Sequence, residues 1–331
     1  MPPGSDSAGP PRQTDGVDRT PGRRRAGPDG WRGLGLVCAA GVIWGTIGPA
    51  VDLVHEWSSL SVLAIGAYRA VIAMLALTLA VLVTGRVAEC LALLRAHPAR
   101  VATAGVMTAT FQLLFFVSVV ASGVSIATVV CLGFAPVLLL VIGSVQRRRP
   151  PSRSRLLTVA AAVVGLLLVS LAGGGQPHAA HPVVGVLTAL GSGTAYALSA
   201  EVGAPLSRGH HALAVATATM SVAALVLVPG GLSVALLRGD VLRSSDPGAW
   251  LLLGYLGVVT MAIAYVLLFA GLRTTASGTA VVATLLEPVT AVAIAVLLLG
   301  ETLTVEGAAG CVLILAAIAT LGRGLEPPEP Q

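Results

Sequence analysis

Ten long apolar segments separated by short polar loops constrain the fold of this chain more than any other feature. Each is close to the roughly 20 residues that a helix needs to cross the ~30 Å hydrocarbon core of a bilayer. Charged residues make up only 11% of the chain, whereas a soluble domain carries about 25%. The sequence therefore predicts an all-α polytopic membrane protein with ten transmembrane helices. These span roughly residues 33–54, 60–84, 100–121, 123–145, 155–172, 182–205, 211–236, 247–272, 275–299 and 303–323.

Arginines mark one side of this membrane protein, and all 20 basic residues of the chain are Arg. With the N-terminus inside, 17 of them fall in cytoplasmic segments, Arg238 and Arg243 fall outside, and Arg69 lies within a span. Cytoplasmic loops carry an excess of basic residues, so both termini are predicted to be cytoplasmic. The net charge of +5 then reflects topology rather than nucleic-acid binding. Residues 1–32 are predicted to be a disordered tail, and residues 324–331 a second tail.

An internal repeat divides the spans into two halves, residues 33–172 and 182–323. Each half has five spans, and an odd number forces the halves into opposite orientations. Such inverted repeats place a substrate site near the membrane midplane and alternate its access between the two sides. Pro136 and Pro288 are predicted to be equivalent helix breaks in the fourth and ninth spans. At an offset of 152 residues the matched pairs are Gly105 with Gly257, Val106 with Val258, Thr108 with Thr260 and Pro136 with Pro288.

Glu287 and Pro288 lie near the middle of the ninth span. A carboxylate at that depth costs about 2.5–3.5 kcal/mol on insertion scales, and Pro288 leaves the carbonyl of Thr284 without its usual helical donor. Lipid cannot satisfy such groups, so protein or a water-filled cavity must. Glu287 corresponds to Ala135 in the first half, so the predicted pathway is not symmetric in charge.

Two segments resemble the second repeat of the EamA-type transporters of the drug/metabolite transporter superfamily. They read LLEPVTAVAIAVLLLGETLTVEGAAGCVLILAAIATL (285–321) and GVVTMAIAYVLLFAGL (257–272). Trp44-Gly45 and Arg69 also fit the pattern. The resemblance implies two inverted five-helix repeats that transport small metabolites across the cytoplasmic membrane, often outward. The first half has Arg148-Arg149 where the second has Gly300-Glu301, so that motif is interpreted as topological.

Six intramembrane side chains are predicted to bind substrate, and each has a structural alternative. The Gln112 amide suits either a substrate or an interhelical hydrogen bond. Arg69 suits either substrate or a fixed ion pair, and the aromatic rings suit either substrate or packing. Glu287 suits either substrate or proton handling, or stabilisation of a neighbouring helix. The six residues are Trp44, Arg69, Gln112, Tyr196, Tyr265 and Glu287.

The sequence contains no ATP-binding motif and no Cys/His spacing typical of a metal site, so no cofactor is predicted. We predict a secondary transporter, an exporter of small metabolites, which is coupled to H⁺ or another ion or is simply facilitated. The alternative is a polytopic membrane enzyme acting on lipid-linked substrates. That enzyme needs clustered His, Asp and Glu at a membrane interface, and the sequence has no such cluster. A membrane scaffold is disfavoured by Glu287 and Arg69, because buried ionisable groups are costly.

Overall fold

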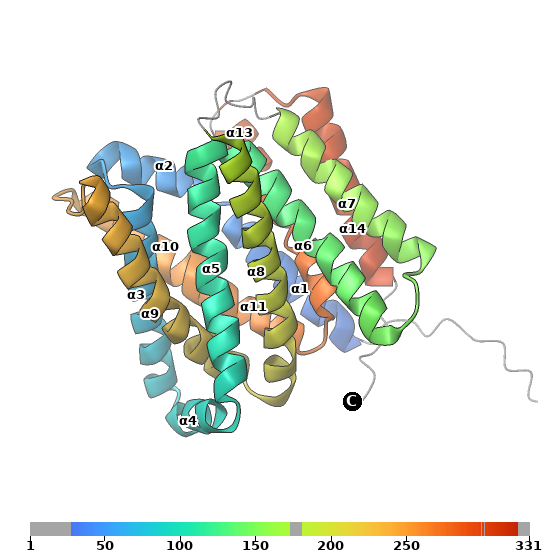
Figure 1. Ribbon diagram of the computed structural model, residues 1–331, viewed down its shortest axis with the longest axis horizontal. Helices are drawn as coiled ribbons and strands as arrows, with labels where there is room; N and C mark the ends of the chain where they lie inside the picture. Colours follow the sequence, from blue (N-terminus) through green and yellow to red (C-terminus); the bar gives the residue numbers. More distant parts are fainter. Residues whose placement is uncertain (1–27, 173–180, 299, 301, 324–331) are drawn as a thin grey trace, which may run out of the picture.

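Every predicted span is helical in the computed structural model, which describes residues 28–172, 181–298, 300 and 302–323 (Figure 1). These residues form helices and connecting turns without any strand. The α-helices are α1 (Pro28–Trp44), α2 (Ile47–Ser58), α3 (Val62–Val83), α4 (Val87–Ala96), α5 (Pro98–Ser122), α6 (Val124–Arg147), α7 (Arg153–Ala172), α8 (Pro182–Gly209), α9 (Ala212–Arg238), α10 (Pro247–Gly257), α11 (Ala264–Leu272), α12 (Ser277–Ala283), α13 (Leu286–Leu298) and α14 (Val305–Arg323). A π-helix, η1 (Val258–Ile263), connects α10 to α11.

The prediction of ten membrane spans is confirmed for the described part of the chain, where ten helical segments are long and apolar enough to cross a bilayer. Three spans are composite: α1 with α2, α10 with η1 and α11, and α12 with α13. Short loops make successive spans antiparallel, so odd-numbered spans begin, and even-numbered spans end, on the same side. The segments are Gly30–Ser58, Val62–Val83, Pro98–Ser122, Val124–Arg147, Arg153–Ala172, Pro182–Gly209, Ala212–Arg238, Pro247–Leu272, Ser277–Leu298 and Val305–Gly322.

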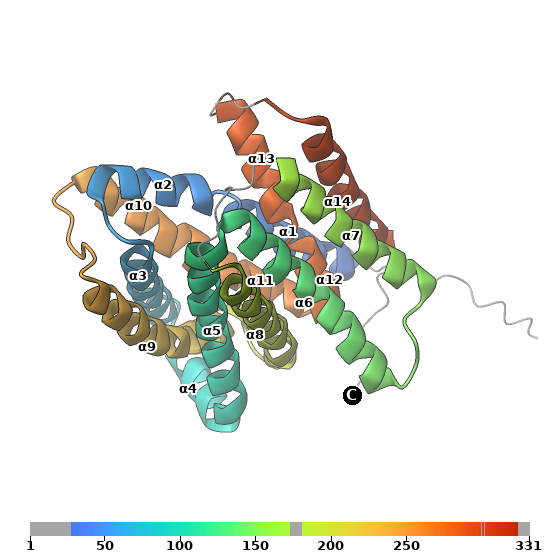
Figure 2. The same ribbon diagram turned by 45° about the horizontal axis from the view of Figure 1, so that its top comes forward.

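The contacts between the two halves repeat when each span is exchanged for its counterpart five spans along the chain. The third span (α5) packs on the sixth (α8), and the eighth (α11) packs correspondingly on the first (α1). The fifth and tenth spans (α7 and α14) pair at one end of the molecule, and the second and seventh (α3 and α9) pair at the other (Figures 1 and 2). This exchange is the packing expected of two inverted five-helix repeats.

Two equivalent glycines show the same repeat in backbone contacts. A Cβ on Gly105 would lie 2.6 Å from the carbonyl oxygen of Thr219, and a Cβ on Gly257 would lie 3.2 Å from that of Arg69. Each glycine therefore lets one helix cross closely over another, as small residues do in membrane proteins. Because Gly105 and Gly257 are equivalent, the residues that they contact, Thr219 and Arg69, are equivalent too. The second half thus has a neutral threonine where the first has Arg69, just as the first half has Ala135 where the second has Glu287.

The predicted helix break at Pro136 is wrong. Helix α6 continues through Pro136, which is buried within it. Proline cannot donate to the carbonyl of Leu132 four residues earlier, but α6 is packed against α5, α7 and α8. Neighbouring helices often keep a proline-containing membrane helix intact by satisfying the groups that proline leaves free.

Two other spans are interrupted near their middles. In the ninth, α12 and α13 are separated at Thr284 and Leu285, just before Pro288. Pro288 has no N–H to donate to the Thr284 carbonyl, which instead accepts a hydrogen bond from the Glu287 amide at 2.9 Å. In the first span, a turn at Gly45 and Thr46 separates α1 from α2. The sequence does not predict this second interruption.

The N-terminal boundary corrects the prediction of a tail through residue 32. Helix α1 already begins at Pro28, and the ring of Trp31 packs on Gly322 of α14. This apolar contact explains why the helix extends beyond the predicted span. The rest of that tail, residues 324–331 and most of the loop 173–181 lie outside the described residues.

Helix α4 lies in the loop between the second and third spans, where the sequence predicts no helix. It packs against α9 of the second half and buries Leu93 completely. The Glu89 carboxylate accepts a hydrogen bond from the backbone amide of His211 at 2.8 Å and forms an ion pair with Arg86 at 2.8 Å. A loop of the first half is thereby attached to the start of the seventh span.

Replacing Glu89 with Gln is expected to lower stability at neutral pH and to have little effect in acid. The His211 amide, followed by Arg86, holds the pKa of Glu89 below its usual value despite partial desolvation. The carboxylate therefore stabilises the fold above its unfolded pKa of about 4.3, and this contribution is lost as the pH falls through the lower folded pKa. Because the side chain is 32% exposed, we expect an effect below about 1 kcal/mol. Thermal unfolding across pH measures it, and a pH-independent difference would contradict this explanation.

Candidate functional site

The interruptions of the first and ninth spans meet beside the π-helix of the eighth. A Cβ on Gly45 would lie 2.6 Å from the carbonyl oxygen of Glu287, so the two backbones are in contact. The indole N–H of Trp44 donates to the carbonyl of Thr260, within η1, at 2.9 Å. Three irregular backbone segments thus meet near mid-span. Such backbone occurs at membrane depth only where protein or a cavity surrounds it, and π-helical turns are frequent at functional sites.

Arg69 of α3 lies against this junction and is only 7% exposed. Its Nη2 donates to the hydroxyl of Thr260 at 3.4 Å, a long hydrogen bond, and its Nε has no partner among the described residues. A buried donor without a partner costs about 1–3 kcal/mol. The guanidinium therefore has a free N–H for an acceptor on a ligand or for a water molecule.

Aromatic side chains surround the junction. The rings of Trp44 and Tyr265 pack edge to face with centroids 5.4 Å apart. The hydroxyl of Tyr196 is hydrogen-bonded to that of Thr284 at 2.8 Å, directly at the interruption of the ninth span. The ring of Phe111 lies 5.0 Å from that of Tyr196. Tyr and Trp rings combine apolar faces with a polar tip, so they can contact a ligand that has both characters.

Glu287 lies in the first turn of α13, where the helix dipole favours a carboxylate. It is close enough to Arg69, Tyr196 and Tyr265 for its charge to act on each of them. No ion pair within 4 Å joins Glu287 to Arg69 in the part of the chain that the structure describes. Glu287 also keeps part of its surface exposed.

Gln112 of α5 is the sixth predicted residue, and no hydrogen bond among the described residues connects it to the other five. It is buried, and its Nε2 has no hydrogen-bond partner among the described residues. Its neighbour Phe111 contacts the ring of Tyr196, which places this part of α5 beside the junction. The interhelical hydrogen bond considered for its amide N–H is not formed in the described structure.

Thr260 and Thr284 belong to the junction but were not among the predicted site residues. The internal repeat contained a signal for Thr260, because it is matched by Thr108. Both hydroxyls donate to the carbonyl four residues earlier, at 2.6 Å for Thr260 and 2.8 Å for Thr108. The extra role of Thr260, as the partner of Arg69 and Trp44, arises only from the tertiary structure.

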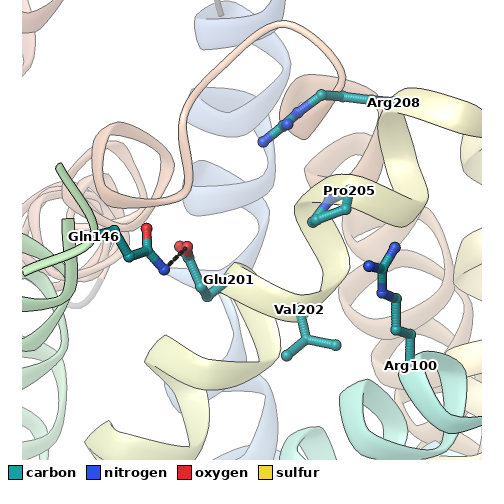
Figure 3. Close-up of a pocket in the computed structure, with 6 residues that line it drawn as sticks. All are labelled: Arg100, Gln146, Glu201, Val202, Pro205 and Arg208. Atoms are coloured by element: carbon teal, nitrogen blue, oxygen red, sulfur yellow. Dashed lines mark hydrogen bonds between the residues drawn. The ribbon is translucent and has the colours of Figure 1, made fainter. Parts of the chain in front are cut away.

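A separate cavity of about 440 Å³ lies at the ends of α5, α6 and α8 (Figure 3). It is on the side where odd-numbered spans begin and even-numbered spans end, away from mid-span. Arg100, Gln146, Glu201, Val202, Pro205 and Arg208 line it. None of these six was predicted to bind substrate.

The sequence profile of the EamA-like transporter family matches residues 31–171 and, a second time, residues 183–323. The chain belongs to the EamA-like transporter family. Each matched segment of this EamA-like transporter contains five of the ten spans found among the described residues. The resemblance found in the sequence is therefore confirmed, and the family favours a membrane transporter over the membrane enzyme considered as the alternative.

This EamA-like transporter is similar to the uncharacterized transporter YwfM of Bacillus subtilis (strain 168). The two are 29% identical over 286 residues, which cover 86% of this chain and 92% of the relative. A protein of known crystal structure shares the fold with a TM-score of 0.72 and 18% identity, covering 87% of this chain and 95% of that one. At that identity the structural similarity shows the fold alone.

Proposed function

We propose that this EamA-like transporter is a secondary transporter that moves small polar or amphipathic metabolites by alternating access. The observation that supports this most directly is the mid-span junction of the first, eighth and ninth spans. Transporters built from inverted repeats bind substrate near the midplane, at discontinuous helices. Here two interrupted helices and a π-helix meet beside Arg69, whose Nε is unpaired among the described residues.

The packing of the ninth span supports a second part of the proposal, that α13 moves during transport while α12 does not. Four consecutive residues of α12, Ala280 to Ala283, are buried, whereas Pro288 is the only buried residue of α13. The turn at Thr284 and Leu285 lies between these two parts. Hinges are commonly a few residues at the ends of helices, so this turn would let α13 move while α12 stays packed.

The chemistry of the junction suggests the class of substrate. Arg69 would donate to a carboxylate, carbonyl or other acceptor, and the rings of Trp44, Tyr196 and Tyr265 would contact an apolar part. Glu287 would bind either a cationic part of the substrate or a proton. We infer coupling to H⁺ or another ion, because the sequence has no nucleotide-binding motif. The outward direction is proposed from the sequence resemblance.

We expect the protein to lie in the cytoplasmic membrane, with both of its termini in the cytoplasm. In a variant without cysteines, we expect a single cysteine at Arg243 to react with a membrane-impermeant thiol reagent in intact cells. A cysteine at Pro150 should react only after the cells are opened. The arginine distribution is the physical reason. Labelling of position 150 but not 243 in intact cells would show the opposite orientation.

A panel of amino acids and toxic analogues tests the transport proposal. A strain that overproduces the protein is expected to tolerate at least one compound better than a deletion strain does. Arg69→Gln should remove that tolerance while its amount in the membrane stays at the wild-type level, since the donor to the substrate is lost. Unchanged tolerance with Arg69→Gln would argue against substrate binding at the junction.

A further inference from the structure

The cavity at the ends of α5, α6 and α8 has a carboxamide and a carboxylate on one wall and two arginines on the other. In Figure 3, Gln146 and Glu201 lie at the left, Arg208 at the top and Arg100 at the lower right, with Pro205 between the two arginines. The cavity is open enough, at about 440 Å³, to admit a phosphate group with its immediate substituents.

The positive charge of this cavity is not balanced. One carboxylate oxygen of Glu201 accepts from Nε2 of Gln146 at 3.3 Å, and the other accepts from the hydroxyl of Ser277. In the described part of the chain, neither Arg100 nor Arg208 has a hydrogen-bond or ion-pair partner. Two guanidinium groups with free donors therefore outnumber one carboxylate whose oxygens are already engaged. Guanidinium donors match the oxygens of a phosphate group especially well.

The position of the cavity selects the source of that phosphate. Helix α5 begins at Pro98, α6 ends at Arg147 and α8 ends at Gly209, so the cavity lies at the level where the spans leave the apolar core. Val202 and Pro205 add apolar surface beside the arginines. Basic pockets between transmembrane helices at this level bind anionic lipid head groups. Inorganic phosphate and small polar phosphate esters would gain nothing from the apolar wall, whereas the apolar part of a lipid would.

We propose that this cavity binds the phosphate of an anionic phospholipid, with Arg100 and Arg208 as its ligands. Arg100 and Gln146 come from the first repeat, whereas Glu201 and Arg208 come from the second. A lipid held there contacts both halves at once on the side opposite the loosely packed α13. The site is distinct from the mid-span junction and does not depend on the transport proposal.

Thermal unfolding of the full-length protein in detergent tests this site at constant ionic strength, because surface electrostatics depend on salt. Dioctanoyl phosphatidylglycerol is expected to raise the Tm by about 2–4 °C. Dioctanoyl phosphatidylcholine, inorganic phosphate and glycerol 3-phosphate at the same concentration should not. Each of Arg100→Gln and Arg208→Gln should weaken the apparent affinity for the anionic lipid about fivefold. Arg100→Lys and Arg208→Lys should keep part of it, because the charge remains.

Arg149→Gln is the matched control, since Arg149 is exposed on the same side but does not line the cavity. It should bind phosphatidylglycerol as the wild type does. An equal rise in Tm with phosphatidylcholine would overturn the proposal, because it would show that any short-chain lipid stabilises the protein, whatever its charge. Equal shifts with phosphate or glycerol 3-phosphate would overturn the assignment to a lipid. Unchanged affinity in the double variant Arg100→Gln/Arg208→Gln, or equal loss with Arg149→Gln, would show that the cavity is not the site.

Discussion

Glu287→Gln is expected to abolish gradient-driven transport in proteoliposomes while substrate exchange and folded yield stay close to wild type. Glutamine keeps the size of the side chain and can still form hydrogen bonds, but it cannot gain or lose a proton. Glu287 is partly exposed at mid-span and has no direct ion pair with Arg69 in the described structure, so its charge is free to change during the transport cycle. Without a side chain that can carry the proton, the gradient no longer drives uptake, whereas exchange of substrate, which needs no net proton movement, continues.

Glu306→Gln provides the control for this experiment, because Glu306 is an exposed acid in the first turn of α14, away from the junction. It should leave both activities unchanged. If Glu287 instead stabilises the fold through Arg69, then Glu287→Gln and Arg69→Gln will each lower folded yield. The double variant will then partly restore it, as interacting residues do in a double-mutant cycle. Normal yield together with undiminished gradient-driven transport would contradict both roles.

The ten membrane spans could be predicted because they depend on composition over about 20 residues at a time. The spans that the structure shows are those whose apolar length and arginine-flanked ends were visible in the sequence. The inverted repeat could be predicted because Gly105 and Gly257 serve the same close helix crossing in both halves. Such a contact demands a glycine on each occasion, which leaves a repeated pattern.

Local backbone irregularities could not be predicted in the same way. Both Pro136 and Pro288 remove one helical hydrogen bond, but α6 is continuous whereas the ninth span is interrupted before Pro288. The difference lies in the packing around each proline, which the sequence alone does not specify. The π-helix at Val258–Ile263 and the turn at Gly45 are likewise stabilised by contacts between distant segments, such as Trp44 with Thr260.

The predicted site residues were recognised because polar groups are costly in a membrane. That reasoning identified six residues, and the structure places all of them except Gln112 around one junction. It could not identify Thr260 or Thr284, since threonine is inexpensive within a membrane helix when its hydroxyl bonds to the backbone. Both do so here. Nor could it identify the cavity beside Arg100 and Arg208, which needs three helix ends to come together.

Gly45→Ala is expected to destabilise the protein by about 1–3 kcal/mol and to reduce transport strongly. The new Cβ would lie 2.6 Å from the carbonyl oxygen of Glu287 and 2.5 Å from the Cβ of Thr290. Because both are on or next to the backbone of α13, no side-chain rotation relieves the clash. The first and ninth spans would have to separate at the junction, and this would displace Glu287 from Arg69.

Gly48→Ala is the matched control, three residues further along the same span. A Cβ at Gly48 would meet nothing within 4 Å, and the position is exposed. Alanine is the better helix former, so this variant should be as stable as the wild type or slightly more so, with normal transport. Thermal unfolding in detergent and uptake into proteoliposomes measure both effects. A Gly45→Ala variant with wild-type Tm and uptake would show that the two spans do not meet at this glycine. Equal losses in both variants would show that the backbone of the span, rather than its contact with α13, is what the substitution disturbs.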